Sequence, residues 1–185
     1  GSVIDREALS RATSVYLVDR TVPMLPERLC NFICSLRPDE DKLAYSVIFQ
    51  LDDKAVVRDW KLAHTVIRSN RRFTYEEVQA VLEAHHEASE EDYKLPGDHF
   101  APINPDAAPA ESFAEDLIRL NRMAKELRRR RFENGSIDFE RSEVRFEIDE
   151  LGHPTSVYFK FAKDANKLVE EFMLLANRMV AESIG

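Results

Sequence analysis

The sequence predicts a mixed α+β fold in which antiparallel hairpins pack with amphipathic helices. Two long stretches, residues 44–67 and 144–161, each contain two extended runs around a central turn, with apolar side chains at alternate positions in 44–51 and 144–161, which is typical of β-hairpins. Three other stretches, residues 74–82, 111–132 and 164–179, carry apolar side chains at steps of three or four, which is typical of amphipathic helices.

The start of the chain predicts short elements. Residues 6–11 favour a helix capped by Asp5, because a carboxylate accepts hydrogen bonds from the first amides of a helix. Residues 15–18 favour a strand, because Val, Tyr and Leu suit a half-buried extended chain. Pro26 fits the first position of a short buried helix, and Pro38 marks its end.

The next part predicts a hairpin followed by a capped helix. Residues 44–51 and 55–67 are expected to pair as antiparallel strands around a turn at 52–54. Thr74 is expected to cap the following helix. Glu77 completes a capping box, because its carboxylate reaches back to the amide of the cap residue.

The second half predicts a loop, a long helix, a hairpin and a last helix. Residues 89–110 lack periodicity and are rich in proline, which predicts an irregular surface loop with solvated acids at 90–92. The helix 111–132 is expected to end before Gly135, a residue suited to a left-handed C-cap. Asp164 is expected to cap the last helix, which follows the second hairpin.

The composition is typical of a globular protein. Hydrophobic residues make up 44% and charged residues 32% of 185 positions, and no apolar run approaches the roughly 20 residues that a membrane span needs. Cys30 and Cys34 lie one helical turn apart, which favours reduced thiols in a core and hence a cytoplasmic protein. The net charge of −8 argues against a surface that binds nucleic acid by charge alone.

Six sequence blocks resemble the RNB domain of the ribonuclease II and ribonuclease R family. They are Ser14–Leu17, Pro23–Pro26, Leu36–Pro38, Arg72–Val78, Gly135–Phe139 and the stretch from Ala162 to Asn177 that ends in EEFMLLAN. The blocks follow one another over nearly the whole chain, so the resemblance is much more specific than a single short motif. Ala12 and Cys30 depart from the family, which often has Gly and Ser at those positions.

The resemblance implies that residues 1–185 are the central part of a single RNB catalytic domain. It implies a parent 3′→5′ exoribonuclease that hydrolyses single-stranded RNA, and not DNA, to nucleoside 5′-monophosphates with Mg²⁺. In the family, the aspartates that hold the metal precede the position that matches Gly1, and a catalytic arginine follows the position that matches Gly185. We therefore expect no metal-binding or catalytic residue in this chain, and no hydrolysis of RNA by this chain alone.

Four side chains match positions that contact RNA in the family. Tyr16 and Phe139 match rings that sandwich bases near the 3′ end, and Tyr75 and Glu170 match positions that contact ribose. Stacking holds RNA without reading its sequence, because every base has a π face. A phenol oxygen or a carboxylate accepts a hydrogen bond from the 2′-hydroxyl, the group by which RNA differs from DNA.

Without the resemblance, the same residues have plainer interpretations. The two rings would be core side chains, Tyr75 a half-exposed residue of a first helical turn, and Glu170 a surface acid. Two basic clusters are candidate phosphate contacts, although exposed ends of elements are the favoured interpretation of both; they are Arg128–Arg131, and Arg68, Arg71 and Arg72. The alternative function is a non-catalytic module for RNA binding or protein interaction on an RNB-like scaffold.

Overall fold

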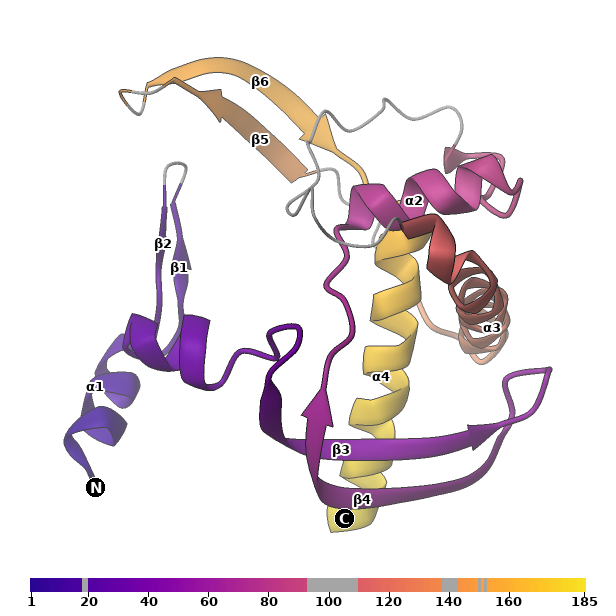
Figure 1. Cartoon of the computed structure of the whole chain (residues 1–185), viewed down its shortest axis with the longest axis horizontal. Coiled ribbons are helices and arrows are strands. Elements are labelled where there is room, and N and C mark those ends of the chain that lie inside the picture. Colours follow the sequence, from indigo (N-terminus) through magenta and orange to yellow (C-terminus); the bar gives the residue numbers. More distant parts are fainter. Residues whose placement is uncertain (18–19, 93–109, 138–142, 150, 152) are drawn as a thin grey trace. The chain divides into compact units, whose positions relative to one another are not determined.

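The computed structural model describes residues 1–17, 20–92, 110–137, 143–149, 151 and 153–185 (Figure 1). The chain divides into two compact units. Residues 1–44, 66–70 and 143–160 belong to one, the hairpin unit, and residues 45–65, 71–142 and 161–185 belong to the other, the helical unit. Helices alternate with two-stranded sheets along the chain, which confirms the predicted α+β class.

The first helix, α1 (Val3–Arg11), begins before the position that the sequence predicted. The hydroxyl of Ser2 accepts a hydrogen bond from the amide of Asp5 at 3.1 Å, so Ser2 and not Asp5 is the cap. Serine caps as well as aspartate does, and this serine stands directly before the helical run. The helix ends at Ala12, whose φ of 62° lies in the left-handed region that favours glycine.

A small hairpin and a π-helix follow in the hairpin unit. Strands β1 (Val15–Tyr16) and β2 (Thr21–Val22) pair antiparallel. The helix η1 (Arg28–Ile33) contains no buried residue, and its Phe32 and Ile33 are exposed. The predicted short helix is therefore present, but the prediction that it is buried is wrong for this chain.

The predicted second hairpin is confirmed. Strands β5 (Glu143–Ile148) and β6 (Pro154–Lys160) pair antiparallel, with a register shift near Ile148. Two cross-strand pairs are apolar, Val144 with Phe159 and Phe146 with Val157, and they alternate with pairs of charged or polar residues. This alternation is the period of two from which the hairpin was predicted.

Strands β3 (Asp41–Leu51) and β4 (Val57–Arg68) form a separate two-stranded sheet. The turn between them is closed by the side chain of Asp52. Its Oδ1 accepts hydrogen bonds from the amides of Lys54 and Val56, both at 2.9 Å. These bonds, the first of them from Val56, lower the pKa of Asp52 and keep its carboxylate ionised in the turn.

Three long helices build the core of the helical unit (Figure 1). They are α2 (Tyr75–Ala84), α3 (Ala114–Glu133), which the short helix η3 (Ala110–Phe113) precedes, and α4 (Asp164–Ile184). Their shared core cluster comprises Val78, Val81, Leu82, Leu117 and Ala165. Phe73 and Phe113 meet edge to face beside it, with ring centroids 5.3 Å apart. Among the described residues, no helix has both the length and the apolar character needed to cross a bilayer.

A buried polar network holds the beginning of α4. Asp92 is 1% exposed, and its Oδ2 accepts hydrogen bonds from the amide of Asp164 at 2.7 Å and from the side-chain amide of Gln79 at 3.1 Å. The other side-chain atom of Gln79, Oε1, accepts from the amide of Ala165 at 3.1 Å. In return, Asp164 Oδ2 accepts from the amide of Ser89 at 2.9 Å.

This network corrects two predictions. Asp92 is not a solvated acid, because it caps a helix that begins 72 residues later. Asp164 is not the cap of its own helix. Lys163 stands at that position, and the carboxylate of Asp164 instead binds Ser89 and forms an ion pair with Lys125 at 3.0 Å.

Candidate nucleic-acid interface

Tyr16 lies at the end of β1 with its ring turned outward. The residue is 79% exposed and pairs with Thr21 across the hairpin. The base of this hairpin is fixed by Ser14, whose hydroxyl accepts a hydrogen bond from the amide of Met24 at 3.0 Å. Tyr16 is therefore exposed and not a core side chain of this chain. Phe139, the other predicted stacking ring, lies outside the described residues, so its role stays a prediction.

Tyr75 is the first residue of α2 and is 43% exposed. Its backbone is fixed by the predicted capping box, in which Thr74 Oγ1 accepts from the amide of Glu77 and Glu77 Oε2 accepts from the amide of Thr74. Arg71 donates to Glu77 Oε1 at 2.7 Å and lies over the ring of Phe73. The capping box and the contact between Arg71 and Glu77 thus hold the first turn of α2, and with it the backbone of Tyr75, in place.

Because of these contacts, Arg71 is not a candidate for binding phosphate. Its side chain is only 6% exposed and forms its ion pair with Glu77 inside the unit. Within the same basic cluster, Arg68 lies 3.7 Å from Asp41 and Arg72 is exposed. The cluster predicted from the sequence is therefore divided between a buried structural residue and surface residues.

Glu170 stands beside a second acid, Glu171, on α4, but the two differ in accessibility. The side chain of Glu170 is 43% exposed, whereas that of Glu171 is 3% exposed. Arg131 of α3 reaches both. Its Nη2 lies 2.5 Å from Glu171 Oε1 and 3.3 Å from Glu170 Oε1, and its Nε lies 3.2 Å from both oxygens of Glu171. Of the two adjacent acids, only Glu170 has a side chain that a ligand can reach.

The arginines at the end of α3 are not the exposed cluster that was favoured. Arg128 and Arg131 face the acids of α4 and flank the ring of Phe132, with guanidinium carbons 4.8 and 4.9 Å from its centroid. Arg130 donates to the carbonyl oxygens of Lys54 and Ala55 in the turn between β3 and β4. The four arginines therefore point in different directions around the helix axis: Arg128 and Arg131 share Glu171, whereas Arg130 reaches the β3–β4 turn.

Arg129 alone of these four is more than half exposed, and it pairs within its own helix. It donates to Glu126 at 2.6 Å and to Glu133. The hydrogen bond from Arg129, assisted by Arg130, lowers the pKa of Glu126 from 4.5 to about 2. The end of α3 is thus a paired acid–base surface, which leaves little net positive charge for a phosphate backbone.

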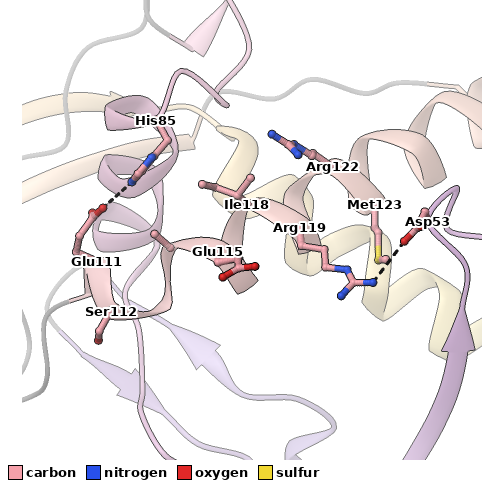
Figure 2. A pocket seen from close by; sticks show the side chains of 10 residues that line it. Asp53, His85, Glu111, Ser112, Glu115, Ile118, Arg119, Arg122 and Met123 are labelled. Carbon is pink, nitrogen blue, oxygen red and sulfur yellow. Dashed lines mark hydrogen bonds and ion pairs between the residues drawn. The ribbon is translucent and has the colours of Figure 1, made fainter.

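The helical unit contains a hollow of about 880 Å³ between α3, the end of α2 and the tip of the β3–β4 turn (Figure 2). A hydrogen bond between His85 and Glu111 at 2.5 Å and an ion pair between Arg119 and Asp53 at 3.4 Å lie at its rim. Arg122 also lines it and pairs with Glu87 at 2.5 Å, which lowers the pKa of Glu87. Acids and bases alternate around this hollow, so it presents no uniform charge to a polyanion such as RNA.

The described residues do not fit a magnesium site. Among them, no three His, Cys, Asp or Glu side chains gather in a way that would hold a metal ion. The buried acids Asp92, Asp164 and Glu171 instead accept from protein amides or pair with Lys and Arg.

Comparisons with known proteins decide the family. The family model described as the RNB domain matches residues 1–184. The chain belongs to the RNB domain family. This result confirms the resemblance drawn from the six sequence blocks.

The relatives of this RNB chain are longer proteins. It is 38% identical over 186 residues to DIS3-like exonuclease 2 of Schizosaccharomyces pombe, a match that covers 100% of this chain and 19% of the relative. It is 35% identical over 185 residues to ribonuclease R 2 of Lactococcus lactis, covering 98% of this chain and 25% of the relative. The chain thus spans about a fifth to a quarter of these curated relatives.

A solved structure shares the fold of the whole chain. Ribonuclease R of Mycoplasma genitalium, in complex with double-stranded RNA, superposes with a TM-score of 0.80 at 25% identity. The match covers 100% of this chain and 29% of that one.

The sequence located Tyr16, Tyr75 and Glu170 by their motifs, and the structure places the last two in the helical unit and Tyr16 in the hairpin unit. Sequence reasoning missed the partnership of Arg131 with Glu170. These residues are 39 positions apart and on different helices, so no local pattern relates them.

Proposed function

We propose that this RNB chain is part of a 3′→5′ exoribonuclease that hydrolyses RNA to nucleoside 5′-monophosphates, and that it supplies residues that grip the substrate. The observation that carries the proposal is the family match over residues 1–184, together with 38% identity to a protein named as an exonuclease. The activity belongs to the intact protein, because the chain spans only a part of such relatives.

Tyr16 and Phe139 are proposed to stack on unpaired bases. The exposure of Tyr16, at 79%, supports this role, because a ring in contact with solvent can take a base on its face. Stacking of this kind tolerates any base sequence, which suits an enzyme that degrades RNA from its end.

Tyr75 and Glu170 are proposed to contact ribose. Both lie in the helical unit, on helices that pack against one another, and each has a side chain partly exposed to solvent. An acceptor close to the 2′-hydroxyl gives a preference for RNA over DNA, because DNA lacks the group that donates.

Two further features remain proposals about the intact protein. Mg²⁺ would be held by residues outside this chain and would supply the activation of water. A cytoplasmic location is consistent with Cys30 and Cys34, which are both free.

The decisive experiment uses the full-length protein that contains this chain and one single-stranded RNA labelled at either end. A 3′→5′ exonuclease releases the 3′ label at once as a mononucleotide and shortens the 5′-labelled strand stepwise. A partly double-stranded RNA with a 3′ overhang serves as the second substrate. The isolated chain, with or without Mg²⁺, is expected to leave both RNAs intact.

Two results would overturn parts of this proposal. Binding of RNA by the full-length protein without hydrolysis would favour the alternative, a non-catalytic RNA-binding module. Hydrolysis by the isolated chain that EDTA abolishes would show that the metal site lies within these 185 residues.

A further inference from the structure

Arg131 links the exposed acid Glu170 to the buried acid Glu171. Its Nη2 lies within 3.3 Å of Glu170 and 2.5 Å of Glu171, so a single guanidinium nitrogen bridges the two carboxylates. The Nε of Arg131 adds contacts to Glu171 at 3.2 Å. Because the guanidinium is planar, fixing it on the Glu171 side also fixes the direction in which Nη2 meets Glu170.

The support beneath Arg131 is itself well packed. The side chain of Glu171 is 3% exposed. Arg128, which lies on α3 with Arg131, approaches Glu171 at 3.6 Å. The ring of Phe132 lies against both guanidinium groups. This arrangement resembles the supporting shell that holds a binding group in place, in which buried partners limit the rotamers of the exposed residue.

We propose that Arg131 is a positioning residue that orients Glu170 to accept a hydrogen bond from a ribose 2′-hydroxyl. Arg131 contacts Oε1 of Glu170, and Oε2 of the same carboxylate is the oxygen offered to the ribose. The inference rests on the proposed function of Glu170, and it adds that selectivity for ribose depends on α3 as well as on α4.

The test measures kcat/KM in the full-length protein for an RNA and for the same sequence with 2′-deoxy nucleotides at its 3′ end. In Arg131→Gln, the preference for the RNA is expected to fall about tenfold, the size of effect that follows the loss of one hydrogen bond to a charged group. Arg131→Lys is expected to restore part of the preference, because it keeps the charge without the planar fork. If the protein binds but does not hydrolyse RNA, the ratio of the two Kd values replaces the ratio of kcat/KM.

Glu170→Ala, which removes the acceptor, and the double variant separate positioning from a general structural role. If Arg131 acts through Glu170, Glu170→Ala lowers the preference, and adding Arg131→Gln lowers it no further. Arg129→Gln is the matched control, since Arg129 pairs only with acids that the structure shows on its own helix, and it is expected to leave the preference unchanged.

Three outcomes would each overturn one part of this inference. An unchanged preference in Glu170→Ala would refute the proposed contact between Glu170 and ribose. A reduced preference in Glu170→Ala with an unchanged one in both Arg131 variants would overturn the positioning role alone. An equal loss of kcat/KM for both substrates in Arg131→Gln, with the preference intact, would show that Arg131 only stabilises the fold.

Discussion

At the scale of single residues, exposure distinguishes Tyr16 from a core ring and Glu170 from its neighbour Glu171. Tyr16 extends into solvent from a two-residue strand, and Glu170 is reachable where Glu171 is not. Neither difference is visible in the sequence, where aromatic rings and acids occur in both buried and exposed positions. The three-dimensional surroundings, and not the residue type, therefore decide which of these side chains can meet a ligand.

Replacing Tyr16 tests whether this exposed ring grips RNA. In the full-length protein, Tyr16→Ala is expected to weaken binding of single-stranded RNA by about 5- to 150-fold, because stacking on one base is worth about 1–3 kcal/mol. Tyr16→Phe keeps the π face and is expected to bind normally. A fluorescence anisotropy titration with a labelled oligomer measures both.

A second exposed ring provides the control for this experiment. Tyr45 is 60% exposed and lies in the helical unit, beside the ring of His64. Tyr45→Ala is expected to leave the affinity for RNA unchanged. Equal weakening in Tyr16→Ala and Tyr45→Ala would show that Tyr16 has no specific place in binding.

The titration of Glu126 is a second prediction at this scale. The hydrogen bond from Arg129 lowers its pKa to about 2, so the ionised form is favoured in the folded state. Since the folded pKa lies below the usual 4.5, the contribution of Glu126 to stability is present above about pH 4.5 and is lost as the pH falls towards 2. Carbon-detected NMR of the side-chain carboxyl gives the midpoint directly.

The Glu126→Gln variant gives an independent check. It removes the titrating group, so its free energy of unfolding is expected to depend less steeply on pH than that of the unmodified chain within the same window. A carboxyl midpoint close to 4.5, or parallel pH profiles of the two proteins, would contradict the ion pair.

At the scale of secondary-structure elements, local sequence patterns correctly predicted caps and hairpins whose interacting residues lie close in sequence. The capping box of Thr74 and Glu77 was predicted correctly because cap and carboxylate are three residues apart. The β5–β6 hairpin was predicted by its alternation. The cap of α4 was not, because its acceptors, Asp92 and Gln79, lie 72 and 86 residues from the amides they bind.

The same limit applies to the candidate interface. Motifs located Tyr75 and Glu170, but the burial of Arg71 and the contact of Arg131 with α4 depend on how helices pack. A run of arginines predicts positive charge, whereas the acids that compensate it are contributed by other elements. The partners of the arginines therefore could not be predicted from local sequence patterns.

The α4 cap leads to a prediction about stability. Asp92→Ala removes the acceptor for the amide of Asp164 and for Gln79 within a buried site, so the free energy of unfolding is expected to fall by about 2–4 kcal/mol. Urea denaturation of the chain, followed by circular dichroism, measures the change. The exposed neighbour Glu91 gives the control, because Glu91→Ala is expected to change stability by less than about 0.5 kcal/mol. Equal effects of the two variants would contradict the buried network.

At the scale of the whole molecule, the apolar core is unevenly distributed. Every buried hydrophobic residue among the described residues belongs to the helical unit; these residues are Ala55, Val78, Val81, Leu82, Leu117, Met123, Ala124, Ala165, Leu175 and Met179. The hairpin unit instead exposes large apolar side chains, such as Leu9 and Phe159. Burial of apolar surface is the main favourable term in folding, so the two units differ in local stability.

Hydrogen exchange of the isolated chain tests this difference. Amides in α2, α3 and α4 are expected to exchange slowly, near the rate set by global unfolding, whereas those in α1 and in the β5–β6 hairpin exchange through local opening. Mass spectrometry of peptides from each element resolves the two classes. Equal protection of β5–β6 and α4 would show that the hairpin unit has stability of its own.

The cap of α4 also determines when this helix can form. Its first amides find their acceptors only after α2 and the turn at Asp92 have been brought alongside, which requires closing two long chain loops. Because closing loops of this length costs chain entropy, the capped first turn of α4 is expected to form late in folding. A synthetic peptide of α4 alone would lack Asp92 and Gln79, so the amides of Asp164 and Ala165 would lose the acceptors that they have in the folded chain.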